Sequence, residues 1–421
     1  MGNSIRRRFK DRHERGKAMA AELFHTPEGV RDLYDKECAR KLAVSERISQ
    51  VFHLYGYQDI ETPTFEFFDV FNKERGSVSS REMFKFFDRD NNTLVLKPDV
   101  TPAIARCVAK YFMEETLPVR LCYRERTFTN NTSYQGRLKE VTQTGVELIG
   151  DDSSTADGEM IAMVIDGLKA SGLKEFQVEV GQMEFFRGLV EEAGMDEETE
   201  EILREQIENK NYFGVEELVS RRNLPDTLRE VFLKLPELFG TLEEIKKVKS
   251  MIRNQRSLKA IERLEEVQAI LEDYEMEEYV SYDLGMLSKY QYYTGIIFKA
   301  YTYGTGEYIV TGGRYDKLLV QFGKDVPAVG FAIVVDQLML AMARQKIDIR
   351  VKMPDIMVVY EAGVQDKAVK TAHSLRKNGV KTVLVRKAEG ISEEECREYW
   401  KRQGIGKLVW VLVGKVITWE E

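Results

Sequence analysis

The stretch "TFTNNTSYQGRLKEVTQTGVELIG", residues 127–150, joins a polar loop to a predicted strand. Its loop residues up to Gln135 are mostly Thr and Asn, and none of them is an arginine. Farther along, Gln143 and Glu147 are four residues apart, so both side chains point to the same face of an extended strand. A polar loop that leads into a strand often holds a charged ligand, but a phosphate would require arginines. The stretch therefore predicts a ligand site whose ligand the loop alone does not identify.

Two strands are predicted on either side of this loop, "LPVRLCYRERTF" (residues 117–128) and "EVTQTGVELIG" (residues 140–150). Residues 83–112 read as strand, polar turn, strand and helix, because Asp-Asn-Asn at 90–92 favours a turn and Pro102 suits the first turn of a helix. This hairpin-rich pattern predicts an antiparallel sheet rather than strands and helices that alternate around a parallel sheet.

Helices are also predicted at residues 33–55 and 154–172, and a buried helix at about 329–345. The segment 185–276 is dense in Glu, Lys, Arg and Leu, which predicts solvated helices. From Pro354 onward, strand and helix patterns alternate as in a small α/β domain. The predicted organisation is a basic tail at 1–22, a discontinuous core at 23–184 and 277–348, a helical insertion at 185–276 and an α/β domain at 354–421.

Composition and charge exclude several classes of protein. Of 421 residues, 43% are hydrophobic and 31% are charged, and Asp336 and Gln337 interrupt the longest apolar run. We therefore expect a soluble protein that does not span a membrane. No apolar segment follows the basic tail, which argues against a secretory signal and predicts a solvated tail or a phosphate-contacting arm. The net charge of −8 argues against a broad nucleic-acid-binding surface.

The four cysteines and four histidines are scattered along the chain without the paired spacing of a zinc site. Unpaired cysteines are typical of reduced thiols in the cytoplasm. The scattered cysteines and histidines therefore predict no metal site, and the unpaired cysteines predict a cytoplasmic protein. We also expect no cofactor.

Several stretches, in this order and spacing, resemble the core of class II histidyl-tRNA synthetases. They are "LKPDVTPAIAR" (96–106), "GRLKEVTQTGVELIG" (136–150), "KYQYYTGIIF" with "TGGRYD" (289–298 and 311–316) and "PAVGFAIVVDQL" (327–338). The resemblance covers residues 26 to 345, and it implies an α+β fold of the class II synthetase type, an antiparallel sheet flanked by helices with a helical insertion. It also implies a homodimer through residues 34–65 around Pro63, and residues 354–421 resemble a shortened anticodon-binding domain.

Positions where the resemblance implies ATP-binding side chains carry other residues in this chain. Thr129 and Asn131 stand where synthetases have an arginine and a glutamate, and Gln337 replaces a further arginine. Ser288 begins the four positions that read Arg-Gly-Leu-Asp in the family. Because each charge-assisted bond to phosphate is worth roughly 1.5–3 kcal/mol, these differences predict that ATP binding and aminoacylation are lost.

Two alternatives to this interpretation stay open. The alignment could be shifted, or Arg124, Arg126 or Arg137 could supply the missing charge. Arg137 matches a family arginine, and Arg137, Tyr292 and Arg314 are candidates for residual anion binding or for lining the pocket.

At the positions that hold histidine in the synthetases, this chain carries side chains of the same chemical type. The resemblance implies a histidine-binding set of Asp99, Thr101, Gln143, Glu147, Tyr293 and Tyr315. Carboxylates and a hydroxyl suit the ammonium of an amino acid, while phenol rings pack on an imidazole and offer it hydrogen bonds. The alternative is structural: Glu147 could be a buried acid, and the two tyrosines could be ordinary core aromatics.

A synthetase fold that keeps a histidine pocket but lacks ATP-binding arginines resembles the regulatory subunits of ATP phosphoribosyltransferase. That resemblance implies a non-enzymatic, cytoplasmic protein that binds the catalytic subunit in a hetero-oligomer. It would be required for the first step of L-histidine biosynthesis and would bind L-histidine for allosteric feedback inhibition. The alternatives are a divergent histidyl-tRNA synthetase and a synthetase-like paralogue with another partner.

Overall fold

The computed structural model describes residues 24–71, 78–112, 114–116, 118–131, 137–288, 292–351 and 353–420. The chain divides into two compact units, of which the first ends at Ile349 and the second is Arg350–Glu421. The basic segment 1–22 lies outside the described residues, as do residues 132–136 of the polar loop and positions 289–291. No helix among the described residues is long and apolar enough to cross a membrane.

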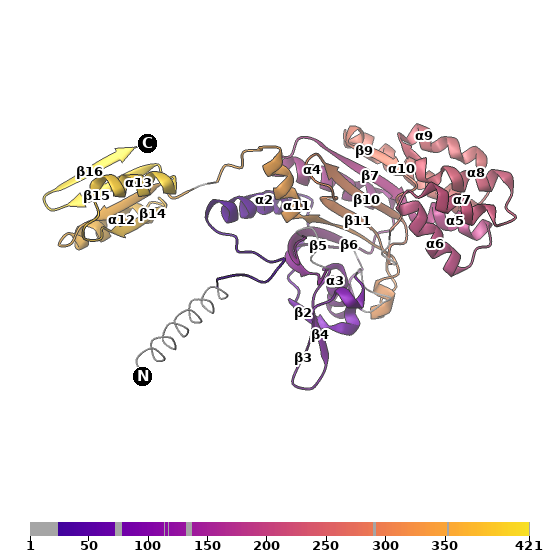
Figure 1. The fold of residues 1–421 in the computed structure, drawn as a ribbon, viewed down its shortest axis with the longest axis horizontal. Helices are drawn as coiled ribbons and strands as arrows, with labels where there is room; N and C mark the ends of the chain where they lie inside the picture. The colour runs from indigo at the N-terminus through magenta and orange to yellow at the C-terminus, as the bar shows by residue number, and fades with distance from the viewer. Residues whose placement is uncertain are drawn as a thin grey trace, which may run out of the picture. The chain divides into compact units, whose positions relative to one another are not determined.

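A nine-stranded sheet forms the centre of the first unit, and most neighbouring strands in it are antiparallel (Figure 1). In spatial order the strands are β1 (Gln58–Asp59), β5 (Val119–Phe128), β6 (Glu140–Ile149), β12 (Ala328–Val334), β11 (Val310–Arg314), β10 (Ile296–Thr302), β7 (Phe176–Gln182), β9 (Val280–Asp283) and β8 (Phe239–Gly240). This sheet confirms the predicted α+β class with a mainly antiparallel sheet flanked by helices. Only β1 with β5 and β7 with β9 are parallel pairs within the described part of this sheet.

Helices α2 (Asp35–Leu54) and α4 (Ser154–Ser171) pack against each other and against the central strands. Their bounds agree within two residues with the helices predicted at 33–55 and 154–172. Gly56 follows α2 in a left-handed conformation, with φ of 82°, as expected for a residue that ends a helix.

The helix predicted at about 329–345 is wrong in its first third. Residues Ala328–Val334 form the central strand β12, and helix α11 (Val335–Arg344) begins only afterwards. The strand is buried on both faces, so its apolar run has no alternation and cannot be told from a buried helix by periodicity.

A small three-stranded sheet precedes β5 in the chain and leads to the helix that borders the site. It consists of β2 (Phe65–Phe67), β4 (Thr93–Leu96) and β3 (Lys85–Phe87), and helix α3 (Thr101–Tyr111) follows. Pro102 lies in the first turn of α3, as predicted.

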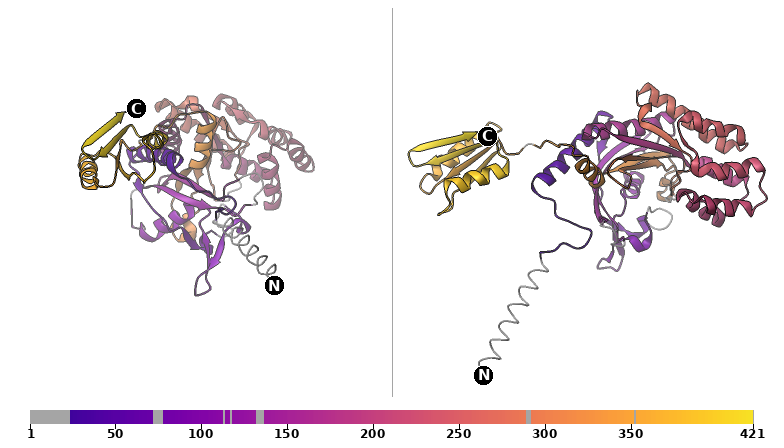
Figure 2. Two further views of the ribbon diagram at one scale, coloured as in Figure 1. Left: turned by 60° about the vertical axis from the view of Figure 1, so that its left-hand side comes forward. Right: turned by 45° about the horizontal axis from the view of Figure 1, so that its top comes forward.

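Six helices follow β7 and gather beside the β7–β9 end of the large sheet (Figures 1 and 2). They are α5 (Met183–Glu192), α6 (Glu197–Glu208), α7 (Tyr212–Ser220), α8 (Asp226–Lys234), α9 (Leu242–Lys246) and α10 (Gln255–Asp273). Each of them buries apolar side chains, so their charged residues mark the outer faces of a packed group. Helix α10 packs against α4 and α5, which joins this group to the core.

Short 3-10 helices complete the first unit. They are η1 (Phe68–Phe71), η2 (Ser80–Glu82), η3 (Leu235–Glu237), η4 (Lys247–Met251), η5 (Glu277–Tyr279) and η6 (Leu319–Phe322).

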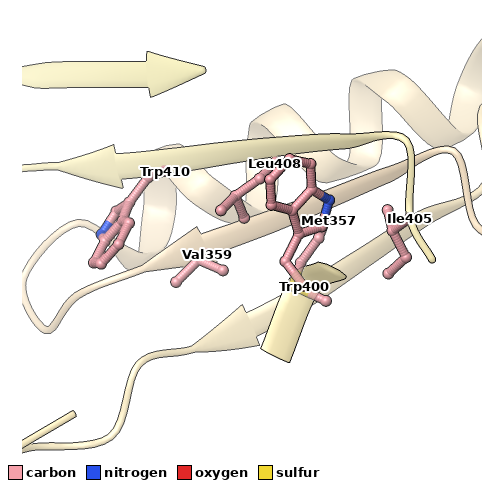
Figure 3. Packing of buried hydrophobic residues seen from close by; sticks show 6 residues of the cluster. All are labelled: Met357, Val359, Trp400, Ile405, Leu408 and Trp410. Atoms are coloured by element: carbon pink, nitrogen blue, oxygen red, sulfur yellow. The ribbon is translucent and has the colours of Figure 1, made fainter. Parts of the chain in front are cut away.

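The second unit is a four-stranded sheet with one helix on each face. Its strands, in spatial order, are β14 (Thr382–Arg386), β13 (Ile356–Tyr360), β15 (Lys407–Leu412) and β16 (Lys415–Glu420), with helices α12 (Gln365–Lys377) and α13 (Glu393–Gln403). Trp400 of α13 packs with Met357, Val359 and Leu408 on one face (Figure 3). Helix α12 buries Ala368 and Ala372 on the other face.

Candidate functional site

Glu147 lies at the centre of the large sheet, on β6, with 1% of its surface exposed. Its carboxylate accepts a hydrogen bond of 2.6 Å from the Thr101 hydroxyl and another from the Tyr315 hydroxyl. The residue opposite Glu147 on β12 is Gly330, and a Cβ atom there would stand 1.8 Å from Glu147 Oε2. The absence of a side chain on Gly330 therefore leaves the space that the carboxylate occupies.

Burial raises the pKa of Glu147 to about 8. The hydrogen bonds from Thr101 and Tyr315 act in the opposite direction and the charge of Asp99 adds to the rise, but desolvation has the largest effect. Glu147 is therefore mostly protonated at neutral pH, and a nearby cation would favour its ionised form.

Asp99 lies just before helix α3 and is tied to the same cluster. Its Oδ1 accepts a hydrogen bond from the Thr101 backbone N–H at 3.3 Å, and its Oδ2 accepts one from the Tyr292 hydroxyl, also at 3.3 Å. Thr101 therefore links two carboxyl groups, one through its amide and the other through its hydroxyl. Two acids joined in this way form a site that suits a cationic group.

Three tyrosines surround these acids, and all three are buried. The ring centroids of Tyr292 and Tyr293 are 4.8 Å apart, and Tyr292 meets Tyr315 edge-on at 6.1 Å. A Cβ atom on Gly313 would lie 2.9 Å from the Tyr293 ring, so this glycine lets the ring lie against β11. Burial first, and then the charge of Asp99, raise the pKa of Tyr293.

Five predicted histidine-binding residues thus lie in one cluster: Asp99, Thr101, Glu147, Tyr293 and Tyr315. Gln143 is on the same face of β6, but four residues along a strand separate it from Glu147 by about 13 Å. The side-chain carbonyl oxygen of Gln143 is buried and has no hydrogen-bond partner among the described residues. A buried acceptor of this kind is available to a donor group of a ligand.

Arg314 is bonded to partners within the chain. Its guanidinium bonds Asp157 at 2.7 and 3.0 Å, Asp316 at 3.3 Å, and the backbone carbonyls of Asp151 and Ser153. All five donors are used in these bonds, so they favour a structural role for Arg314 over anion binding, and its place at the pocket stays a prediction. These bonds form because α4 brings the buried Asp157 beside β11, a contact that the sequence motif does not reveal.

Arg137, the other anion candidate, is exposed and pairs with Glu307 at 2.9 Å. Gln337 also donates a hydrogen bond to Glu307, at 3.3 Å. An acidic partner at this place neutralises Arg137 and disfavours a phosphate.

Three further positions differ from the synthetase pattern, and two of them form hydrogen bonds with nearby backbone groups. The Thr129 backbone N–H donates to the Lys139 carbonyl at 2.8 Å, and the Asn131 side chain donates to the backbone of Leu138 at 3.4 Å. Ser288 is buried, at 6% exposure. Among the described residues, none of these three side chains places a positive charge there.

Tyr123 was missed by sequence reasoning, although it lies within the cluster. It is buried on β5 opposite Gly145, where a Cβ atom would stand 2.7 Å from the Tyr123 hydroxyl. Burial first, and then the charges of Glu147 and Asp99, raise its pKa well above the ordinary value. The two arginines at every second position were the available signal, because Arg124 and Arg126 on the outward face put Tyr123 on the inward face.

A buried ion pair lies on the same face of β5 and was also missed. The Lys97 ammonium contacts the Glu125 carboxylate and donates to the Thr62 hydroxyl at 3.0 Å and to its carbonyl at 3.1 Å. This group connects the segment after β1 with the segment that carries Asp99.

Comparisons with known proteins agree with this fold. The family model described as histidyl-tRNA synthetase matches residues 29–338. An "ATP phosphoribosyltransferase regulatory subunit" of Acetivibrio thermocellus is 42% identical over 394 residues, which is 94% of each chain. The protein of the same name from Ruminiclostridium cellulolyticum is 43% identical over 400 residues, which is 95% of each chain.

Solved structures show the same architecture. A crystal structure from Bacillus halodurans C, titled as an ATP phosphoribosyltransferase regulatory subunit/histidyl-tRNA synthetase, superposes with a TM-score of 0.83 at 30% identity and covers 93% of this chain and 98% of its own. A histidyl-tRNA synthetase from a Nostoc species shares the fold, with a TM-score of 0.77 at 18% identity over 94% of this chain and 97% of its own.

The fold and the site thus define a class II synthetase-like protein of the histidyl-tRNA synthetase type. Within that class, the chain belongs to the family of ATP phosphoribosyltransferase regulatory subunits.

Proposed function

We propose that this chain is the non-catalytic regulatory subunit of ATP phosphoribosyltransferase. In this role it binds the short-form catalytic subunit, is required for the first step of L-histidine biosynthesis, and binds L-histidine for feedback inhibition. The observation that carries the proposal is the buried cluster in which Thr101 links Asp99 and Glu147 beneath three tyrosines. The relatives are named regulatory subunits, which supports the proposal that this chain has a catalytic partner.

The chemistry of the cluster fits an amino-acid ligand. The ammonium group of histidine would lie between the two carboxyl groups and favour ionisation of Glu147, whose pKa burial holds at about 8. The Tyr293 and Tyr315 rings would pack on the imidazole. Gln143 offers a buried acceptor farther along β6.

Feedback requires that histidine bind one state of the complex better than another. A coupling free energy of about 1–3 kcal/mol is typical of such effects. Glu147 accepts hydrogen bonds from both Thr101 and Tyr315. A ligand that takes over one of these bonds would shift helix α3 or the segment after β11, and this movement would carry the signal to the catalytic subunit.

The positions that bind ATP in synthetases support a non-catalytic role. Thr129, Ser288 and Gln337 stand where arginines are expected, and Arg137 is paired with Glu307. Adenylation would need charged donors that match phosphate, and neutral side chains do not provide them.

A divergent histidyl-tRNA synthetase remains the second candidate, because the relative from Bacillus halodurans C carries both names in its title. Histidine-dependent exchange of pyrophosphate into ATP would support that second candidate.

We also propose that the chain acts in the cytoplasm as a homodimer within the hetero-oligomer. Residues 34–65 form the proposed dimer face, and their exposed apolar side chains Tyr34, Leu42, Leu54 and Phe65 support it. Residues 185–276 are the proposed helical insertion, and residues 354–421 the domain that resembles a shortened anticodon-binding domain.

A double variant, Glu147→Gln with Tyr293→Phe, tests the pocket directly. Because it removes an ionisable group and a hydroxyl from the cluster, we expect histidine inhibition of the reconstituted enzyme to weaken by at least about tenfold. Binding to the catalytic subunit, measured by size-exclusion chromatography, should stay as in the wild type. Glu198→Gln with Tyr303→Phe, which changes two exposed residues of the same types, is the matched control. Unchanged inhibition in the pocket variant would refute the assignment.

A further inference from the structure

His53, Asp59 and Cys122 bring three different metal-binding atoms together outside the site described above. The imidazole Nε2 of His53 lies 3.1 Å from Asp59 Oδ2, and the Cys122 thiol donates to Asp59 Oδ1 at 3.5 Å. One ligand atom from each of the three residues lies within 4.8 Å of the other two. Neither this cluster nor its residues take part in the proposed histidine pocket.

Regular structure fixes the backbone at all three residues. Asp59 and Cys122 are direct neighbours in the parallel pairing of β1 with β5, and the Ile60 amide donates to the Cys122 carbonyl at 2.8 Å. His53 is in the last turn of α2, where the Gly56 amide donates to the His53 carbonyl at 3.0 Å. The helix end and the strand pair therefore hold the three backbone positions close together, which lowers the entropic cost of bringing the donors to one ion.

The donors lie near enough to one another to share one ion. With Zn–S of about 2.3 Å and Zn–N and Zn–O of about 2.0–2.1 Å, a tetrahedral zinc site places its ligand atoms about 3.3–3.5 Å apart. The thiol lies 3.5 Å from Asp59 Oδ1 and the imidazole 3.1 Å from Asp59 Oδ2, so the exposed side chains of His53 and Asp59 must rotate to bring one oxygen within reach of both partners. We propose that His53, Asp59 and Cys122 bind a divalent zinc-type ion, with a water molecule as the fourth ligand.

The donor set selects the kind of ion. A thiolate with an imidazole favours Zn²⁺ over Mg²⁺ or Ca²⁺, which prefer oxygen ligands. The Cys122 thiol must release its proton when it binds the ion, because the thiolate is the ligand. The ion would join the end of α2 and strand β1, both in the proposed dimer segment 34–65, to strand β5.

Cobalt substitution is the first test, with Co²⁺ added to the full-length reduced protein as a spectroscopic stand-in for Zn²⁺. We expect a thiolate-to-cobalt charge-transfer band and the visible bands of tetrahedral cobalt at one equivalent. Cys122→Ser should abolish the charge-transfer band, and His53→Gln or Asp59→Asn should each weaken affinity by at least about tenfold, since even outer-shell changes cost that much. Cys396→Ser and His373→Gln, in the second unit, are matched controls that should leave the titration unchanged.

Thermal unfolding with and without Zn²⁺ gives a second, independent measurement. Zn²⁺ should raise the Tm of the wild type and of Cys396→Ser, and a chelator should reverse the rise. The rise should be lost in Asp59→Asn, a conservative change at an exposed side chain that keeps the fold even where Cys122→Ser does not. Absence of the charge-transfer band, or a band and Tm rise that persist in Asp59→Asn and His53→Gln, would overturn the proposal and show adventitious binding only.

Discussion

At the scale of single residues, burial and the neighbouring partners decide what each ionisable group does. Glu147 and Asp157 are both buried carboxyl groups on adjoining elements. Asp157 is paired with Arg314 and Arg263, so it has a structural role. Among the described residues, the Glu147 carboxylate is hydrogen-bonded only to neutral hydroxyls, and burial raises its pKa to about 8, so it suits a cationic ligand.

The raised pKa of Glu147 predicts a pH dependence of stability. The folded chain holds this proton more tightly than the unfolded chain, whose pKa is near 4.5, so this contribution to the free energy of unfolding is complete below about pH 4.5 and falls as pH rises toward 8. Glu147→Gln should lose less stability than the wild type between pH 5 and pH 8. Urea unfolding at matched pH values measures this, with Glu198→Gln as an exposed control. Identical pH profiles for wild type and Glu147→Gln would contradict the assignment.

Arg314 predicts a large effect on stability. Arg314→Ala leaves Asp157 buried with only Arg263 as a charged partner, so we expect the free energy of unfolding to fall by about 3–5 kcal/mol. Denaturant unfolding measures the loss. Adding Asp157→Asn to Arg314→Ala should restore part of it, because the uncompensated charge is removed. A loss below about 1 kcal/mol for Arg314→Ala would show that the buried pair is not what holds α4 to β11.

These two residues also show how far sequence could reach at this scale. Glu147 was predictable because a strand alternates and a family motif surrounds it. The bonding of Arg314 was not, because Asp157 is 157 residues away in sequence. The same limit explains the His53, Asp59 and Cys122 cluster, whose spacing matches no metal motif.

At the scale of elements, glycines in paired strands leave space for the buried side chains of the site. Gly330 on β12 faces Glu147, and Gly145 on β6 faces Tyr123. The antiparallel strands around the loop were predictable from alternation and turn residues. Strand β12 was mistaken for a helix because both of its faces are buried, and strand β16 was not predicted at all.

Gly330→Ala tests this account of the strand pairing. Its Cβ atom would stand 1.8 Å from Glu147 Oε2 and 2.5 Å from the Val146 carbonyl oxygen. Overpacking of this kind should lower the free energy of unfolding by about 1–3 kcal/mol. Gly306→Ala is the matched control, because nothing lies within 4 Å of its added Cβ atom. Thermal or urea unfolding compares the two variants. Equal stabilities would show that the space between β6 and β12 can accommodate a Cβ atom at position 330.

At the scale of the whole molecule, the chain combines a synthetase-like unit with a small α/β unit that has its own core. The first unit carries the acid and tyrosine cluster, and the family to which the chain belongs is one of regulatory subunits. The fold class and this family could be predicted from four motifs in order. The packing of side chains could not be predicted in this way, because it depends on contacts between segments that are far apart in the sequence.

Calorimetric titration of the full-length chain with L-histidine and, separately, with ATP is the most direct test of the proposed function. Because the acid cluster is kept while arginines are missing from the ATP-binding positions, we predict a one-to-one heat of binding for histidine and none for ATP. Glu147→Gln should reduce the histidine affinity by at least about tenfold, and Glu198→Gln should leave it unchanged. Tight ATP binding, or no binding of histidine, would contradict the account.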